Sequence, residues 1–161
     1  MTAQDRKALI ARYKAGYAEV ESALRGIAPA ELDWRPAPTE WSAREVVHHL
    51  ADSEEIAGQR LRRLLTEDAP RIQGYDQDAL AHRLRYAERP MEPALRAFEA
   101  ARATTSQLLD LMTDADWQRA GTHSESGPYS ATRWLEVYAA HAHDHAAQIR
   151  KNREGWAARR A

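Results

Sequence analysis

The chain has 161 residues, of which 43% are hydrophobic and 29% are charged, with a net charge of −1 and no cysteine. This balance predicts one soluble globular domain over residues 1–161, and the lack of cysteine excludes disulfides, thiolate metal ligands and a cysteine nucleophile. No run approaches the ~20 apolar residues of a membrane span, the N-terminal segment lacks the apolar centre of a secretory signal, and the charge offers nothing to nucleic acid, so we expect a cytoplasmic protein without nucleic-acid or membrane partners.

The first half of the chain predicts two long helices. Apolar residues recur at helical spacing over residues 4–24, and a proline-punctuated loop follows at 29–38. Ser42 then offers an N-cap, and Glu45 three residues later completes a capping box. The helix that starts there is expected to extend to about Thr66.

The second half predicts two more long helices, separated by long connections. Residues 67–92 form the first connection, with a short helix expected near 77–86. A third long helix is expected to begin near Pro93, because proline suits the first turn. A glycine-rich connection at 113–129 precedes Ser130, which is expected to cap a fourth helix reaching about Asn152.

These elements define the expected fold class. No segment shows a strand pattern that competes strongly with the helical spacing. Four long amphipathic helices in one domain predict an all-α protein, a four-helix bundle. The length of the connections argues for crossovers and against a simple up-down-up-down order.

A cluster of histidines lies in the last predicted helix, in AAHAHDHAAQIR. His141 and His145 are four residues apart, so they share one face of a helix, offset by ~40°. His143 points ~200° away from His141 and cannot join the pair. Asp144 lies beside the pair, off its line. Two histidines at this spacing are a known way for one helix to give two imidazoles to a metal.

A third ligand would have to come from elsewhere in the chain. His48 and His49 are adjacent in the second predicted helix, so only one can face a shared site, and periodicity does not choose between them. His82 and His123 lie in the two connections. The alternative is that these histidines are hydrogen-bonded core residues or surface residues, although several buried imidazoles without a partner would be costly.

Three segments carry a resemblance to a known family: EWSAREVVHHLADSE (40–54), LTEDAPRIQGYD (65–76) and LEVYAAHAHDHAAQI (135–149). Together they resemble the DinB/YfiT superfamily, and especially its YfiT-like branch. The family pattern is a tryptophan that opens a helix, a histidine eight residues later and a late HxxxH. The matching positions are Trp41, His49, His141 and His145.

The resemblance implies a fold and a metal site. Members have a four-helix bundle with long crossovers and are often homodimers, and three histidines hold a divalent metal, zinc or nickel. It therefore selects His49 over His48 and places the metal on His49, His141 and His145. Asp144 stands where close members can carry another histidine. Because this position is off the line of His141 and His145, the difference hardly affects the metal site.

Such a site supports more than one function. Three neutral imidazoles leave a coordination position open, which is typical of catalytic sites. The resemblance implies first a metal-dependent hydrolase that activates water against a small-molecule substrate. The alternatives are a thiol S-transferase, in which the metal holds a low-molecular-weight thiol such as bacillithiol, mycothiol or glutathione, and a non-catalytic module that binds a metal or small ligand.

Further candidate residues lie close to the expected ligands in sequence. Asp52 and Asp144 are candidates for orienting ligand histidines, as such ligands usually require, and the alternative for each is a carboxylate that faces solvent. The candidates for substrate binding are Tyr75, Asp76, Tyr138, Gln148 and Arg60.

Overall fold

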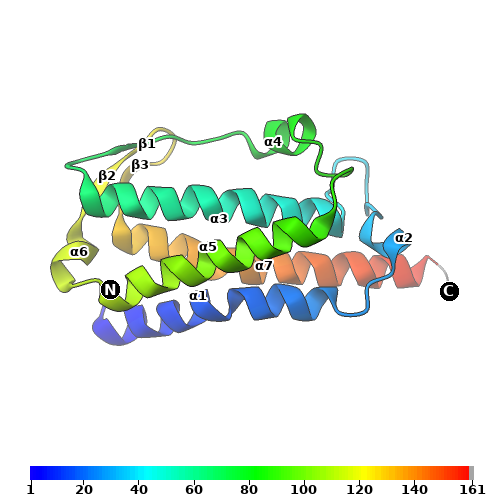
Figure 1. The fold of residues 1–161 in the computed structure, drawn as a ribbon, viewed down its shortest axis with the longest axis horizontal. Helices are drawn as coiled ribbons and strands as arrows, with labels where there is room; N and C mark the ends of the chain where they lie inside the picture. Colours follow the sequence, from blue (N-terminus) through cyan, green and yellow to red (C-terminus); the bar gives the residue numbers. More distant parts are fainter. Residues whose placement is uncertain (160–161) are drawn as a thin grey trace.

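Four long helices form the bundle of this protein, which a computed structural model describes over residues 1–159 (Figure 1). They are α1 (Ala3–Leu24), α3 (Ala43–Thr66), α5 (Met91–Leu111) and α7 (Ala131–Ala158). Each lies close to the range expected from the spacing of apolar residues, except that α7 continues beyond its expected end at Asn152. The expected four-helix bundle is confirmed.

Side-chain caps set the starts of the two helices that carry the histidines. The Ser42 hydroxyl accepts a hydrogen bond from the Glu45 N–H, and the Glu45 carboxylate accepts one from the Ser42 N–H, so the capping box of α3 is formed. At the start of α7, the Ser130 hydroxyl accepts from the Arg133 N–H. These bonds satisfy amides that a helix start leaves free.

The long helices are not arranged in simple sequential order. α1 packs against α7 and α5, and α3 packs against the same two helices, so α1 and α3 lie diagonally opposite. α1 and α7 run in one direction and α3 and α5 in the other (Figure 1). This order is possible because the connection from α3 to α5, which includes α4 (Gln77–Arg83), carries the chain back along the bundle, as the predicted crossover requires.

A small sheet lies at one end of the bundle, where helices and little else were expected. It joins β1 (Arg71–Ile72), β2 (Ala120–His123) and β3 (Gly127–Ser130), with β1 and β2 parallel and β2 and β3 antiparallel. The expectation of no strands is wrong here because each strand has only two to four residues, too few to show a period. Two short helices, α2 (Pro29–Leu32) and α6 (Asp114–Gln118), also lie in segments expected as loops.

The interior of the bundle contains two apolar clusters with a charged pair between them. Leu50 belongs to one cluster and Leu61 to the other, and Glu54 lies between these positions on α3. Glu54 forms an ion pair with Arg102 of α5, and the two side chains are 0% and 2% exposed. A buried charge at this level has to be paired, because an isolated one would be very costly.

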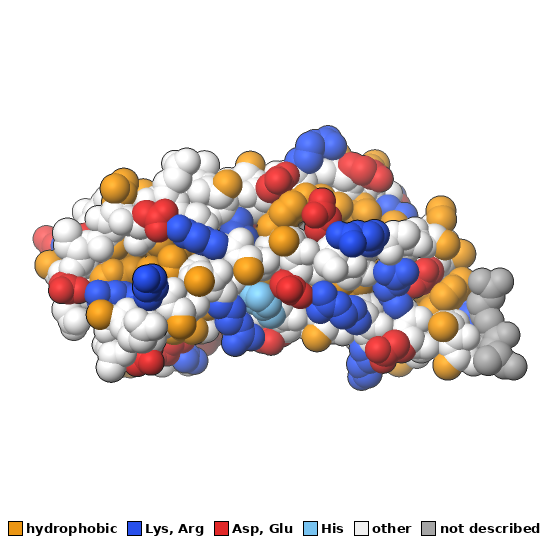
Figure 2. All heavy atoms as spheres, turned by 90° about the horizontal axis from the view of Figure 1, so that it is seen from below, with side chains coloured by type: hydrophobic (Ala, Val, Ile, Leu, Met, Phe, Trp, Pro, Cys, Tyr) orange, Lys and Arg blue, Asp and Glu red, His pale blue; other side chains and the backbone are white. Residues whose placement is uncertain are grey.

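The surface carries both signs of charge. Figure 2 shows basic and acidic side chains interspersed over one face of the bundle, with apolar side chains between them. Among residues 1–159, no helix combines the length and the apolar character that crossing a bilayer requires.

Candidate metal centre

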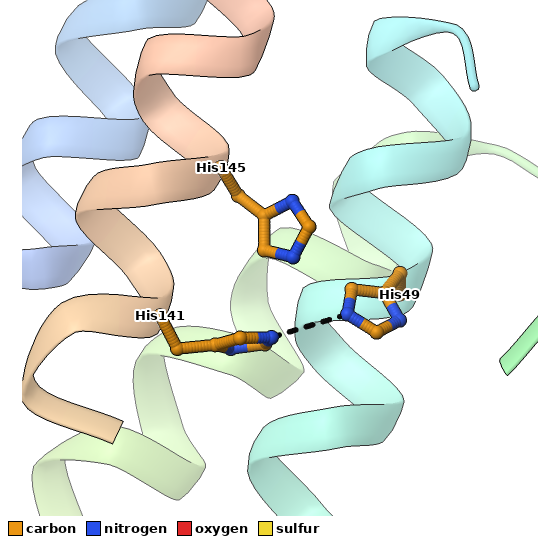
Figure 3. A group of neighbouring side chains, drawn as sticks. All are labelled: His49, His141 and His145. Atoms are coloured by element: carbon orange, nitrogen blue, oxygen red, sulfur yellow. Dashed lines mark hydrogen bonds between the residues drawn. The ribbon is translucent and has the colours of Figure 1, made fainter. Parts of the chain in front are cut away.

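Three histidines from two antiparallel helices meet inside the bundle. His49 projects from the first half of α3, and His141 and His145 project from successive turns of α7 into the same space (Figure 3). One nitrogen of each ring lies within 4.8 Å of the other two. The Nε2 atoms of His49 and His141 are 3.2 Å apart, the contact drawn as a dashed line in Figure 3.

The spacing of these nitrogens suits a small divalent ion. Two imidazole nitrogens on a tetrahedral zinc, each bonded at about 2.05 Å, are separated by about 3.3 Å. The 3.2 Å between His49 and His141 is close to that value. The Nδ1 atom of His141 is buried without a hydrogen-bond partner among the described residues. An all-imidazole donor set suits zinc, nickel, copper or iron better than magnesium or calcium.

The environment keeps all three rings neutral. Burial, followed by the charge of neighbouring imidazoles, lowers the pKa of His49 to about 3 and that of His141 to about 2. Burial also lowers the pKa of His145, although a hydrogen bond from its ring to Gln148 opposes the shift. Neutral imidazoles keep a lone pair on one nitrogen, which is the form that binds metals.

Gln148 orients one of the three rings. Its Oε1 atom lies 2.8 Å from Nδ1 of His145. Because an amide oxygen can only accept, we assign the proton to Nδ1 of His145, which leaves its Nε2 lone pair directed at the cluster. Gln148 was predicted as a substrate-binding residue, and this contact gives it an orienting role as well.

The two carboxylates predicted to orient the histidines make no hydrogen bond to the three rings. Asp52 accepts a hydrogen bond from the Tyr86 hydroxyl and not from His49, because it lies on the flank of α3 that faces the long connection. Asp144 is exposed on α7 and has no hydrogen bond among the described residues. What packs against the ring of His49 is Trp41, with ring centroids 4.8 Å apart.

The remaining histidines lie outside the cluster. His48 is as buried as His49, but it stacks on Tyr86 and its Nε2 contacts the carbonyl of Arg89, 3.2 Å away. His143 faces α1, where its Nε2 lies 2.9 Å from the Arg12 carbonyl oxygen. His82 of α4 and His123 of β2 also lie apart from the cluster. Each lies in one of the two long connections, as the sequence indicated.

A cavity borders the histidine cluster at His145. Its volume is 310 Å³, and its lining includes Trp41, His145 and Gln148 together with Gln77 and Asp78 at the start of α4. The start of α4 and the residues before α3 therefore border this cavity opposite His145. A pocket of this size can admit a small molecule.

The other predicted substrate-binding residues divide into two groups. Asp76 caps α4, where its carboxylate accepts from the N–H groups of Asp78 and Ala79, and its contact with substrate stays a prediction. Tyr138 is buried, and its ring centroid is 5.9 Å from that of His141. Arg60 and Tyr75 lie next to Tyr138, on the side of the cluster away from His145.

Comparison with known proteins places this chain in a family. The model of the DinB superfamily matches residues 12–149. A protein from Geobacillus thermodenitrificans is 31% identical over 160 residues, which cover 96% of this chain and 88% of that protein. One from Oceanobacillus iheyensis is 37% identical over 109 residues, covering 68% of this chain and 63% of that protein. Both are named as candidate metal-dependent hydrolases.

A solved structure has the same fold. YfiT from Bacillus subtilis, described as a candidate metal-dependent hydrolase with an unusual four-helix bundle topology, superposes with a TM-score of 0.91. The match covers 98% of this chain and 90% of that one, at 24% identity. The crossover arrangement of the bundle is therefore shared with that protein.

Proposed function

This chain belongs to the DinB superfamily, and from that premise we propose that it is a metal-dependent hydrolase whose metal is held by His49, His141 and His145. The observation that carries the proposal is the convergence of three neutral imidazoles from two helices, with nitrogens within 4.8 Å of one another. The names of the relatives support hydrolysis as the reaction class.

The roles of the residues follow from their contacts. His49, His141 and His145 would hold zinc or nickel through ring nitrogens and leave a position free for other ligands. When bound, such a metal supplies Lewis-acid chemistry, in which it polarises a carbonyl or phosphoryl oxygen and generates hydroxide near neutral pH. Gln148 keeps the proton on Nδ1 of His145, and Trp41 shields the His49 ring from solvent.

The cavity beside His145 limits the class of substrate. Its volume of 310 Å³ is at the lower end of the range for small-molecule sites. We therefore propose a small organic substrate with an ester, amide or related bond. The chain of 161 residues would perform this function as one domain.

Metal content and turnover test the proposal together. Protein purified without a histidine tag or chelator should contain about one zinc or nickel per chain by elemental analysis, and should hydrolyse members of a panel of activated esters and amides. His145→Ala should lose both properties. His143→Ala is the matched control, because that ring lies on the same helix but faces Arg12, and it should retain both.

Other outcomes would each contradict the proposal in a recognisable way. If the protein consumes an electrophilic test compound only when a low-molecular-weight thiol is added, it is a thiol S-transferase. Bound metal without turnover in any assay would identify a binding module. Protein that binds no zinc or nickel would remove the basis of all three functions.

A further inference from the structure

Arg60 lies on the same face of α3 as His49. The two residues are eleven positions apart, so at 100° per residue they are offset by only ~20°, with ~16 Å between them along the helix. On the facing helix α7, Tyr138 precedes His141 by three residues and lies on the same side. Tyr138 therefore lies between the histidine cluster and Arg60, because its ring is beside that of His141 and its hydroxyl accepts a hydrogen bond from Arg60.

The guanidinium of Arg60 is held by neutral groups. Its Nη1 donates to the Tyr138 hydroxyl at 3.0 Å, and its Nη2 donates to the Gln73 carbonyl oxygen at 2.6 Å. The Tyr75 ring lies 5.4 Å from the guanidinium carbon. The Nε atom is buried and has no hydrogen-bond partner in the described chain. No carboxylate of residues 1–159 lies within the 4.0 Å of an ion pair with Arg60.

Its neighbour Arg63 provides an internal comparison. Both arginines line one cavity of 270 Å³ beside the strand β1 and the segment that follows it. Arg63 is neutralised by Glu67, with Nε and Nη2 each 2.8 Å from a carboxylate oxygen. The cavity is lined by no carboxylate, so it carries one positive charge, that of Arg60, without a counterion.

A half-buried guanidinium without a carboxylate is an incomplete site. Buried charges in proteins are normally paired, and a planar guanidinium matches a planar carboxylate in a bidentate contact. A ligand with a single negative charge balances the one positive charge of Arg60, which favours a carboxylate over a doubly charged phosphate as the ligand. Each Nη atom of Arg60 carries two hydrogens and donates one hydrogen bond within the chain, so each has a further donor for such a contact.

We propose that the substrate is a carboxylate-bearing molecule, whose carboxylate binds Arg60 while its reacting bond lies at the histidine cluster. Tyr138, which contacts both His141 and Arg60, lies between the two ends, and Tyr75 lies beside Arg60. This inference rests on the proposed function, since it places the reacting bond at the metal. It adds the charge of the substrate and the residue that selects it.

Metal-binding ligands with and without a tail charge test this proposal independently of turnover. The probes are monohydroxamates of straight-chain dicarboxylic acids, over a series of chain lengths, and the methyl ester of each. The hydroxamate end binds the metal in both compounds, and only the tail differs. Calorimetry on the zinc-loaded protein should show that the free carboxylate of the best length binds ~10–100-fold more tightly than its ester.

Two variants assign the preference to one residue. Arg60→Gln should bind acid and ester equally, with the affinity for the ester unchanged. Arg63→Gln should keep the preference, because Glu67 already neutralises Arg63. Circular dichroism checks that both variants are folded, and the wild-type comparison of acid and ester stands even if one is not.

The outcomes separate this proposal from the one on which it rests. Equal affinity of the wild-type protein for acid and ester at every length would overturn the carboxylate site and leave the metal site intact. Loss of the preference in Arg63→Gln as large as in Arg60→Gln would also overturn it. Failure of all hydroxamates to bind would overturn the metal site and this proposal together.

Discussion

The buried pair of Glu54 and Arg102 allows a quantitative test of what holds the bundle together. Arg102 donates from Nε to the Tyr13 carbonyl oxygen at 2.7 Å, from Nη2 to the Tyr138 carbonyl oxygen at 3.0 Å, and from Nη1 to the Glu54 carboxylate. The other oxygen of that carboxylate accepts from the Tyr13 hydroxyl. One side chain of α5 thus contacts α1, α3 and α7.

Replacing Arg102 with methionine should leave Glu54 as an uncompensated buried charge. Breaking a buried ion pair in this way costs about 3–5 kcal/mol, and two carbonyl groups lose their donor as well. A domain of this kind has a free energy of unfolding of about 5–15 kcal/mol, so the loss should be a third or more of it in most of that range. Burial raises the pKa of Glu54, consistent with the cost of its charge.

A second substitution separates the pair from its parts. Arg102→Met combined with Glu54→Leu removes both charges, and apolar replacement of a whole buried pair is often neutral. The double variant should therefore be more stable than Arg102→Met alone. Arg133→Met, which removes an exposed partner of Glu136 with side chains 59% and 43% exposed, should show no measurable change.

Urea unfolding of the metal-free protein, followed by circular dichroism, measures these differences. The expected order is wild type and Arg133→Met, then the double variant, then Arg102→Met. Two results would refute the reasoning. One is a loss of less than about 1 kcal/mol in Arg102→Met, which would mean that water reaches Glu54. The other is a double variant that is no more stable than Arg102→Met alone.

Two further predictions concern the histidine cluster. Gln148→Leu should lower zinc affinity about 10–100-fold because it removes the acceptor that orients His145. Asp144→Asn is the control and should leave zinc affinity unchanged, since Asp144 is exposed. Competition with a chromophoric chelator measures both affinities, and an equal loss in the two variants would contradict the orienting role of Gln148. The metal-free protein should lose stability as the pH falls from 7 to 5. Burial holds the pKa of His49 and His141 far below 6.5, the pKa of a histidine in the unfolded chain. The unfolded chain therefore binds protons in this pH range that the folded protein does not bind, which favours unfolding. The loss should be about 1.4 kcal/mol per pH unit for each of the two rings below pH 6.5, and a urea midpoint that does not change with pH would contradict it.

The helices could be predicted because their signals are local. The capping box of α3 and the serine cap of α7 lie within four residues of sequence, and the apolar spacing is continuous through each long helix. The sheet could not be predicted, because β1 pairs with a strand about fifty residues away, as Arg71 opposite Thr122 shows. The sequence of a two-residue strand does not indicate which distant segment pairs with it.

The candidate site was predictable only in part for a similar reason. The spacing of His141 and His145 placed them on one face, but His48 and His49 are 1% and 3% exposed, so neither burial nor periodicity separates them. The direction of each ring depends on its neighbours, which are Tyr86 for His48 and α7 for His49. The Glu54–Arg102 pair was missed because charged residues on a helix are usually solvated, and only helix packing buries them.

The order of the helices has a consequence for synthesis on the ribosome. His49 and His141 are 92 residues apart, so at typical elongation rates α3 emerges roughly 5–20 s before the helix that completes the cluster. Until Arg102 emerges, 48 residues after Glu54, the nascent chain exposes Glu54 without its partner, and throughout the interval α1 lacks the α7 surface against which it packs. Newly made chains are therefore obliged to wait for their last helix, and that delay is when chaperones and proteases have access to them.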